Sequence, residues 1–126
     1  MQALPGARRA TIDPPKLAGY TLNPDHPGNN GKAEGWREMG YEVDTPEGRS
    51  RSAAKIEPLI RQSAVLTSAE FERKDDYGRF YRTWLITRGP NCRLGRLVCS
   101  WQIDNSGTTR LVTTLVQPFK EGKNDR

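Results

Sequence analysis

The sequence predicts an α+β fold in which short N-terminal helices pack on a C-terminal four-stranded antiparallel sheet. Up to about residue 62 the apolar residues recur at helical spacing, whereas beyond residue 66 they alternate with polar residues, as in strands. Short turn sequences at 75–78 and 104–107 separate the alternating segments. Strands joined by such turns are antiparallel. A length of 126 residues fits one domain, so we expect residues 1–126 to form a single domain.

Three helices are expected in the N-terminal half. The first begins after Asp13, a candidate N-cap, and ends before Pro24, because a residue that precedes proline avoids the helical conformation. The second is expected at about 31–39, where apolar residues recur at helical spacing. The third is expected at about 52–62, and Pro58 either kinks it or marks the first turn of a shorter helix.

Four strands are expected in the C-terminal half. The alternating segments there are rich in β-branched and aromatic residues, which favour strands. The two ends of the chain, 1–11 and 120–126, contain few apolar residues and are expected to be flexible. The expected strands cover about residues 66–73, 80–86, 97–103 and 111–116.

The charge of the chain favours a polyanionic partner. The formal net charge is +5, which fits nucleic acid, an anionic membrane or an acidic protein, with a merely solubilising surface as the alternative. No apolar run approaches the roughly 18 residues of a membrane span. Residues 1–11 show no signal-peptide pattern, so if the protein is exported its export address lies elsewhere, for example in a larger precursor.

The metal ligands and cofactor motifs of common enzyme classes are missing from the sequence. The chain has one histidine, and Cys92 and Cys99 lie seven residues apart, so no zinc site is expected. We expect two buried or unreactive thiols, with a disulfide between them as the alternative. Glycine-rich nucleotide motifs and a carboxylate cluster are also missing, so we expect no cofactor and no metal.

The candidate catalytic residues are His26 and Lys32. Pro24 and Pro27 flank the Asp25-His26 pair and restrict its backbone. Lys32 follows six residues later, at the expected start of a helix, where the positive end of the helix dipole favours anions. A neutral imidazole beside a bound phosphate suits base catalysis on a ribose 2′-hydroxyl. The alternative is a surface histidine that only shapes the loop.

The expected strands carry many basic and aromatic residues. Arginine binds phosphate through two parallel hydrogen bonds, and aromatic rings stack on bases. The alternative is that the aromatic residues form the core and the arginines a solvated face. Thr113 is a candidate phosphate-binding hydroxyl. The arginines concerned are Arg73, Arg79, Arg82, Arg88, Arg93, Arg96 and Arg110, among the aromatic residues Tyr77, Tyr81, Trp84 and Trp101.

Several short motifs resemble a bacterial family of unknown function. They are Leu-Asn-Pro-Asp-His-Pro at 22–27, Gly-Lys-Ala at 31–33, Gly-Tyr at 40–41, and the strand sequences at 97–101 and 110–113. Together these motifs span about residues 12–118. The family looks like toxin-associated domains, found as C-terminal modules of polymorphic or contact-dependent-inhibition toxins. Its layout of helices followed by four strands is also that of the barnase/EndoU/colicin/RelE group of ribonucleases.

Two departures from the family pattern bear on these expectations. Cys99 stands where the family favours threonine, which removes a hydroxyl at that position. Gly35-Trp36 replaces the usual aromatic pair in the second helix, a change that affects packing more than chemistry.

The resemblance implies a metal-independent ribonuclease toxin that cleaves tRNA and is neutralised by an acidic immunity protein. It would be exported within a larger toxin, act in the target-cell cytoplasm, and be cytoplasmic when bound to its immunity protein. His26 would be the general base, Lys32 would stabilise charge, and Thr113 would act with them. The expected substrate-binding residues are Arg82, Trp101 and Arg110. The alternatives are another small toxin enzyme, directed at NAD or nucleotides, and a non-catalytic RNA- or protein-binding module.

Overall fold

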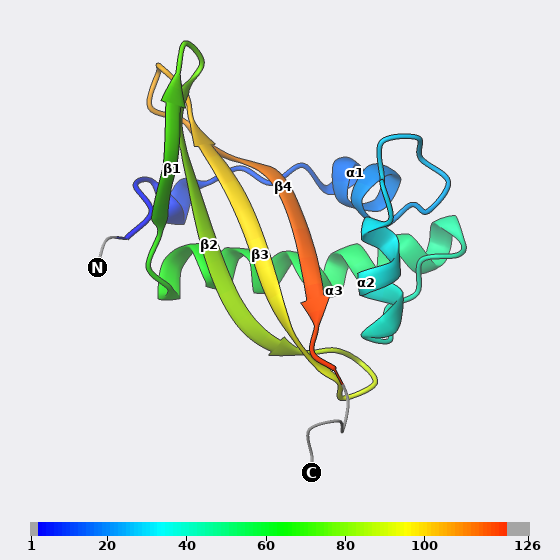
Figure 1. Cartoon of the computed structure of the whole chain (residues 1–126). Helices are drawn as coiled ribbons and strands as arrows, with labels where there is room; N and C mark the ends of the chain where they lie inside the picture. The colour runs from blue at the N-terminus through cyan, green and yellow to red at the C-terminus, as the bar shows by residue number, and fades with distance from the viewer. Residues whose placement is uncertain (1–2, 121–126) are drawn as a thin grey trace.

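The computed structural model describes residues 3–120 and confirms the predicted α+β fold, with helical elements first and a four-stranded sheet last. The strands are antiparallel and adjacent in chain order, β1-β2-β3-β4. In Figure 1, α3 crosses behind the sheet, and α1 and α2 lie beyond the edge formed by β4. The elements are η1 (Ala7–Arg9), α1 (Pro14–Lys16), η2 (Leu17–Thr21), α2 (Lys32–Glu38), α3 (Pro46–Leu66), β1 (Glu70–Asp75), β2 (Gly78–Arg88), β3 (Leu94–Ile103) and β4 (Thr109–Pro118).

The sheet has one buried face and one exposed face. On β3 the side chains of Leu97, Cys99, Trp101 and Ile103 are buried and alternate with half-buried ones, so they point to the side that α3 covers. None of the described side chains of the opposite face is buried. We call this surface the open face; it includes Phe80, Arg82, Trp84, Ile86, Arg96, Val98, Ser100, Gln102, Arg110, Thr113 and Leu115.

Helix α3 is longer than the expected helix at about 52–62. It begins at Pro46, because the Thr45 hydroxyl accepts a hydrogen bond from the Gly48 N–H (2.9 Å) and caps the helix. Pro58 neither ends nor begins it, since the helix continues through that position to Leu66. The longer α3 also moves the start of β1 from the expected residue 66 to Glu70.

The N-terminal segment differs most from the expectation. Residues 1–11 were expected to be flexible, yet Leu4 is only 2% exposed and Ala10 is buried. Thr11 forms a parallel bridge to Arg110, which adds this segment to the outer edge of β4. That pairing connects residues from nearly opposite ends of the chain, so no local sequence pattern predicts it. Of the C-terminal segment expected to be flexible, residues 121–126 lie outside the described residues, as do residues 1–2.

The short helices differ in detail from the single helix expected after Asp13. Asp13 makes no side-chain capping hydrogen bond, and α1 is followed at once by η2, a wider π-helical turn. Leu17 and Thr21 of η2 are buried. Helix α2 then starts one residue after Gly31, which has a positive φ of 82°. Gly40, with a φ of 96°, follows the end of α2 as expected for a C-terminal cap.

Candidate functional site

The loop that carries His26 connects η2 to α2 and is held by its own hydrogen bonds. The Asn23 side-chain oxygen accepts from the Asp25 N–H (3.0 Å), and the Asn23 carbonyl accepts from the His26 N–H (3.2 Å). The His26 carbonyl in turn accepts from the Asn29 N–H (2.9 Å). The His26 side chain itself is exposed. The backbone of the loop is therefore fixed while the imidazole faces solvent.

Asn29 fastens this loop to the two flanking elements. Its side chain is 2% exposed, and its amide nitrogen donates to the carbonyls of Tyr20 (2.7 Å) and Thr21 (2.9 Å). Its amide oxygen accepts from the Ala33 N–H (2.9 Å) in the first turn of α2. One buried side chain thus sets the position of the end of η2, the loop and the start of α2.

Three side chains meet at this loop, and we call them the His26 cluster: Tyr20, His26 and Lys32. The rings of Tyr20 and His26 are in edge-to-face contact, with centroids 4.8 Å apart. The Lys32 ammonium lies 5.7 Å from the centroid of the Tyr20 ring. Within residues 3–120, Lys32 has no carboxylate partner. Two of the three predicted catalytic residues, His26 and Lys32, therefore both contact the Tyr20 ring, whereas the third, Thr113, lies on the sheet.

The hydrogen bonding of His26 fixes which ring nitrogen carries the proton. The Gly28 N–H donates to His26 Nδ1 (3.0 Å). A ring nitrogen that accepts a hydrogen bond is unprotonated, so the neutral ring has its proton on Nε2. In this form Nε2 is a hydrogen-bond donor. To accept a proton at Nε2, the ring must first place a proton on Nδ1 and give up the bond from Gly28.

Three of the predicted sheet residues, Arg82, Arg110 and Thr113, lie on one face of the sheet. Arg82, Ser100 and Thr113 are aligned across β2, β3 and β4, because Arg82 pairs with Ser100 and Ser100 pairs with Thr113. Arg82 forms an ion pair with Glu72. The Thr113 hydroxyl oxygen is buried and has no hydrogen-bond partner in the described structure. Arg110 pairs with Gln102 and so lies in the neighbouring row of the same face.

Arg110 is held by a carboxylate at the β3–β4 turn. Its guanidinium forms an ion pair with Asp104. The Asp104 carboxylate also accepts from the Ser106 hydroxyl (2.6 Å) and from the Thr108 N–H (3.1 Å). These hydrogen bonds, that of Ser106 above all, lower the pKa of Asp104 to about 2. A phosphate that binds Arg110 must therefore compete with an ionised carboxylate.

Trp101 lies in the core, which corrects its expected role as a substrate-binding residue. Its side chain is 0% exposed, and its indole N–H donates to the Thr83 hydroxyl (2.9 Å). It occupies the face of β3 that α3 covers, so it cannot touch a substrate on the open face. Strand alternation explains the difference, because odd-numbered residues of β3 point inward.

Two features of the site were missed at the level of the sequence. Tyr20 was not among the predicted site residues, yet its ring contacts His26 and Lys32. On the open face, two guanidinium groups lie near the Trp84 ring, at 5.5 Å (Arg82) and 4.8 Å (Arg96) from its centroid. The signal for this second feature was the two-residue period of β2, which places Trp84 on the face opposite to the buried residues.

The two groups of candidate residues form separate surfaces. Helix α2 lies beside β4 (Figure 1), and an added Cβ at Gly35 would be 2.5 Å from the Val116 carbonyl oxygen of β4. The His26 cluster is therefore close to the β4 edge of the sheet. In the part of the chain that the structure describes, no hydrogen bond, ion pair or ring contact joins the cluster to the open face.

The cysteines and the acidic residues form no metal site in the described structure. Cys92 is exposed and Cys99 is buried, and both are free, so the alternative of a disulfide is not realised. Burial raises the pKa of the Cys99 thiol. Among residues 3–120, no group of three or more His, Cys, Asp or Glu side chains is placed to hold a metal ion. None of the helices described there has the length and apolar character needed to cross a membrane.

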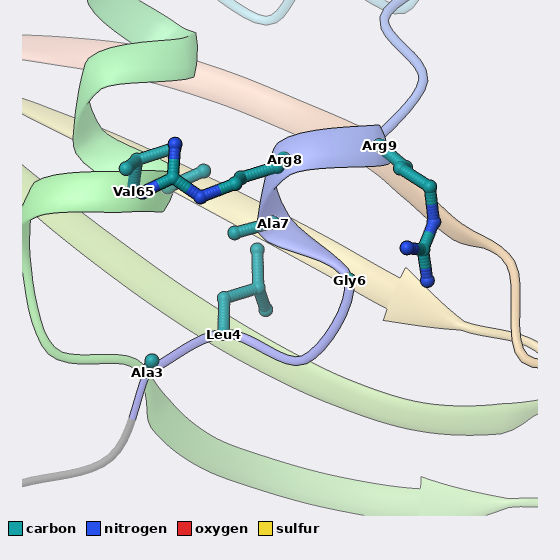
Figure 2. A pocket seen from close by; sticks show the side chains of 8 residues that line it. Ala3, Leu4, Gly6, Ala7, Arg8, Arg9 and Val65 are labelled. Carbon is teal, nitrogen blue, oxygen red and sulfur yellow. The ribbon is translucent and has the colours of Figure 1, made fainter.

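A hollow of about 350 Å³ lies where the N-terminal segment meets the end of α3 (Figure 2). Figure 2 shows the Arg8 side chain reaching toward Val65, whereas Arg9 points to the other side. None of the predicted site residues lines this hollow. Its lining consists of Ala3, Leu4, Gly6, Ala7, Arg8, Arg9, Ala64 and Val65.

Comparison with known proteins first defines the class of fold. The chain is similar to one chain of the "Contact-dependent growth inhibition toxin - immunity protein complex from Klebsiella pneumoniae 342", with a TM-score of 0.62 and 17% sequence identity. The match covers 86% of this chain and 100% of that chain. At this identity the likeness shows a shared α+β fold.

The sequence then places the chain in a family. It belongs to the family described as "Domain of unknown function (DUF6883)", whose model matches residues 3–118. A search of curated proteins found no match.

Proposed function

We propose that this domain is a toxin that cleaves RNA without a metal ion, with tRNA as the expected substrate. The observation that carries the proposal is the His26 cluster, in which the half-buried Tyr20 ring contacts both the exposed His26 imidazole and the Lys32 ammonium, which has no carboxylate partner among the described residues. The similar chain from Klebsiella belongs to a complex of a growth inhibition toxin with its immunity protein, which supports a toxin-related role. Of the two proteins in such a complex, the toxin is the one proposed here to act on a polyanion, and the net charge of +5 fits that role.

The cluster contains the groups that RNA cleavage by the 2′-hydroxyl requires. In the proposed reaction, His26 takes the proton of the 2′-hydroxyl and the 2′-oxygen attacks the phosphorus. The bond from phosphorus to the 5′-oxygen then breaks, which leaves a 2′,3′-cyclic phosphate and a 5′-hydroxyl. Lys32 stabilises the negative charge that develops on the phosphoryl oxygens. We assign protonation of the leaving 5′-oxygen to Tyr20, the tyrosine in ring contact with His26.

The base role of His26 carries a structural requirement. Because Gly28 donates to Nδ1, the neutral ring presents Nε2–H. Base catalysis through Nε2 therefore needs the other tautomer, and the substrate must stabilise that tautomer on binding. Arg82, Arg110 and Thr113 are proposed to hold phosphates of the RNA beyond the reacting one, since they lie on the open face and not in the cluster.

The proposed partner is an acidic immunity protein that covers the His26 cluster. Opposite charges accelerate association at low salt. Delivery within a larger toxin and action in the target-cell cytoplasm belong to the same proposal. A complex in which the inhibitor leaves His26 open to solvent would contradict this placement.

The direct test is incubation of the purified protein with tRNA in excess EDTA and without added nucleotide. We expect cleavage products that end in a cyclic phosphate. Lys32→Ala should lower the rate strongly, whereas Lys32→Arg keeps the charge and should retain activity if Lys32 acts only electrostatically. Lys55→Ala, an exposed lysine of α3, is the matched control. Activity that chelation abolishes and added metal restores would exclude the proposed chemistry, and a requirement for NAD would indicate the alternative class of toxin enzyme.

A second candidate function is a non-catalytic RNA-binding module. The specific observation in its favour is the same Gly28–His26 hydrogen bond, which makes the neutral imidazole a donor rather than a base. This candidate predicts tRNA binding without cleavage in the same experiment.

A further inference from the structure

The central strands form a long segment without acidic residues. Residues 77–103, which include β2, β3 and their connection, contain five arginines and no Asp or Glu. The expected strand period of two places these arginines on both faces and on the connecting loop. Two of them, Arg82 and Arg96, belong to the open face, where both guanidinium groups lie near the Trp84 ring. Of these two, Arg82 is paired with Glu72 of β1, whereas Arg96 has no carboxylate partner among the described residues.

Arg96 is the most available of these charges. Arg82 is paired with Glu72, and Arg88 donates to the carbonyl of Cys92 (2.8 Å). Arg96, by contrast, has no hydrogen bond or ion pair in the described structure, and its one contact of this kind is with the Trp84 ring. A guanidinium that rests on an aromatic ring is preorganised and still has its N–H donors free for an oxyanion.

The neighbouring rows add groups that suit a nucleic acid. Trp84, Val98 and Leu115 form an apolar row across three strands, on which a base can stack. The adjacent row carries the hydroxyls of Ser100 and Thr113, and the Thr113 hydroxyl oxygen has no partner in the described structure. Hydroxyl donors contact the phosphate and sugar oxygens of a nucleic acid backbone.

We propose that the open face around Trp84 and Arg96 binds single-stranded RNA, with Arg96 on a phosphate and a base stacked against Trp84. This inference rests on the proposed function, since it names how an RNA substrate is held beside the His26 cluster. An acidic protein is the other polyanion that would fit the charge. The hydroxyl row and the stacked guanidinium favour RNA, because they offer donors and ring surface to phosphates and bases.

The experiment uses a labelled 2′-O-methyl RNA oligonucleotide, which cannot be cleaved by 2′-hydroxyl attack. Binding to the wild-type protein is measured by fluorescence anisotropy across a salt series. Arg96→Gln should weaken binding about fivefold near 0.1 M salt and reduce the slope of log K against log salt by about 0.7, the loss of one phosphate contact. Trp84→Leu should weaken binding at least about fivefold through lost stacking. Lys55→Gln on α3 removes the same charge elsewhere and should change binding less than about twofold.

A second readout needs no variant. Trp36 and Trp101 are buried, at 1% and 0% exposed, so Trp84 is the tryptophan that acrylamide can reach. Bound RNA should protect the Trp84 fluorescence of the wild-type protein from acrylamide quenching. Unchanged quenching, or equal losses of binding in Arg96→Gln and Lys55→Gln, would overturn the inference.

The remaining outcomes separate the two proposals. Polyglutamate of equal charge serves as a competitor. If it displaces the labelled RNA as effectively as unlabelled RNA does, the surface belongs to an acidic protein partner and the inference is overturned. If the protein binds the uncleavable RNA through Trp84 and Arg96 yet never cleaves tRNA, the inference stands and the proposed function fails. If tRNA is cleaved but the Arg96 and Trp84 variants bind RNA like the wild type, the proposed function stands and the inference fails.

Discussion

Replacement of Asn29 by alanine tests how the site is built. The buried Asn29 side chain makes three hydrogen bonds, to the carbonyls of Tyr20 and Thr21 and from the N–H of Ala33. Each such bond contributes about 0.5–1.5 kcal/mol net. Three bonds therefore give a loss of about 1.5–4.5 kcal/mol in the free energy of unfolding, and the buried Ala33 N–H is left without this acceptor.

The assay for Asn29→Ala is urea unfolding followed by circular dichroism, together with tRNA cleavage under conditions where the variant is folded. We expect the urea concentration at the unfolding midpoint to fall and tRNA cleavage to be lost, because the loop no longer holds His26 beside Lys32. Asn30→Ala is not a suitable control, since Asn30 has a positive φ of 53°. Asn105→Ala, which removes one exposed hydrogen bond from another turn, is suitable. A change in unfolding free energy below about 0.5 kcal/mol for Asn29→Ala would refute the reasoning.

Three further predictions concern the fold. Thr83→Val should cost about 1–3 kcal/mol in urea unfolding, because it leaves the Trp101 indole N–H unpaired in the core; equal stability would contradict this. Gly35→Ala should destabilise the protein by about 1–3 kcal/mol despite the helix propensity of alanine, because its Cβ would lie 2.5 Å from the Val116 carbonyl oxygen; a raised melting temperature would show that α2 can move away from β4. Asp104→Asn should lower stability at neutral pH but not near pH 2. The pKa of Asp104 in the folded state is depressed to about 2. The stabilisation by its carboxylate is therefore present above the ordinary carboxyl pKa and is lost as the pH falls through the folded-state pKa. A destabilisation by Asp104→Asn that is the same at pH 7 and pH 2 would contradict that origin.

The sheet could be predicted from the sequence because its signals are local. The alternation of apolar and polar residues, together with short turn sequences, identifies the strands. The observed strands extend the predicted ones by only a few residues, apart from the later start of β1. The start of α3 had a local signal as well, threonine followed by proline at 45–46. That signal was outweighed by the polar residues of the first turns, which are mostly exposed in the structure.

The remaining features depend on contacts between distant segments. Thr11 reaches the edge of β4 through a bridge to Arg110, and this buries Leu4 and Ala10, which no local period predicts. The proximity of His26 and Lys32 followed from their short separation in the chain. The contact of Tyr20 with both depends on the π-helical turn of η2, which the spacing of apolar residues does not reveal.

The central claim is that His26 belongs to the reacting groups of an RNA-cleaving toxin. The most direct measurement is induction of the domain in bacteria, with wild type and His26→Ala compared by growth and by gel analysis of total RNA. His26 is exposed, so the variant should fold as the wild type does, while loss of a general base lowers the rate by about 10² to 10⁴. We predict growth arrest and tRNA fragments for the wild type and neither for the variant. A folded His26→Ala protein that arrests growth and fragments tRNA as well as the wild type would contradict the claim.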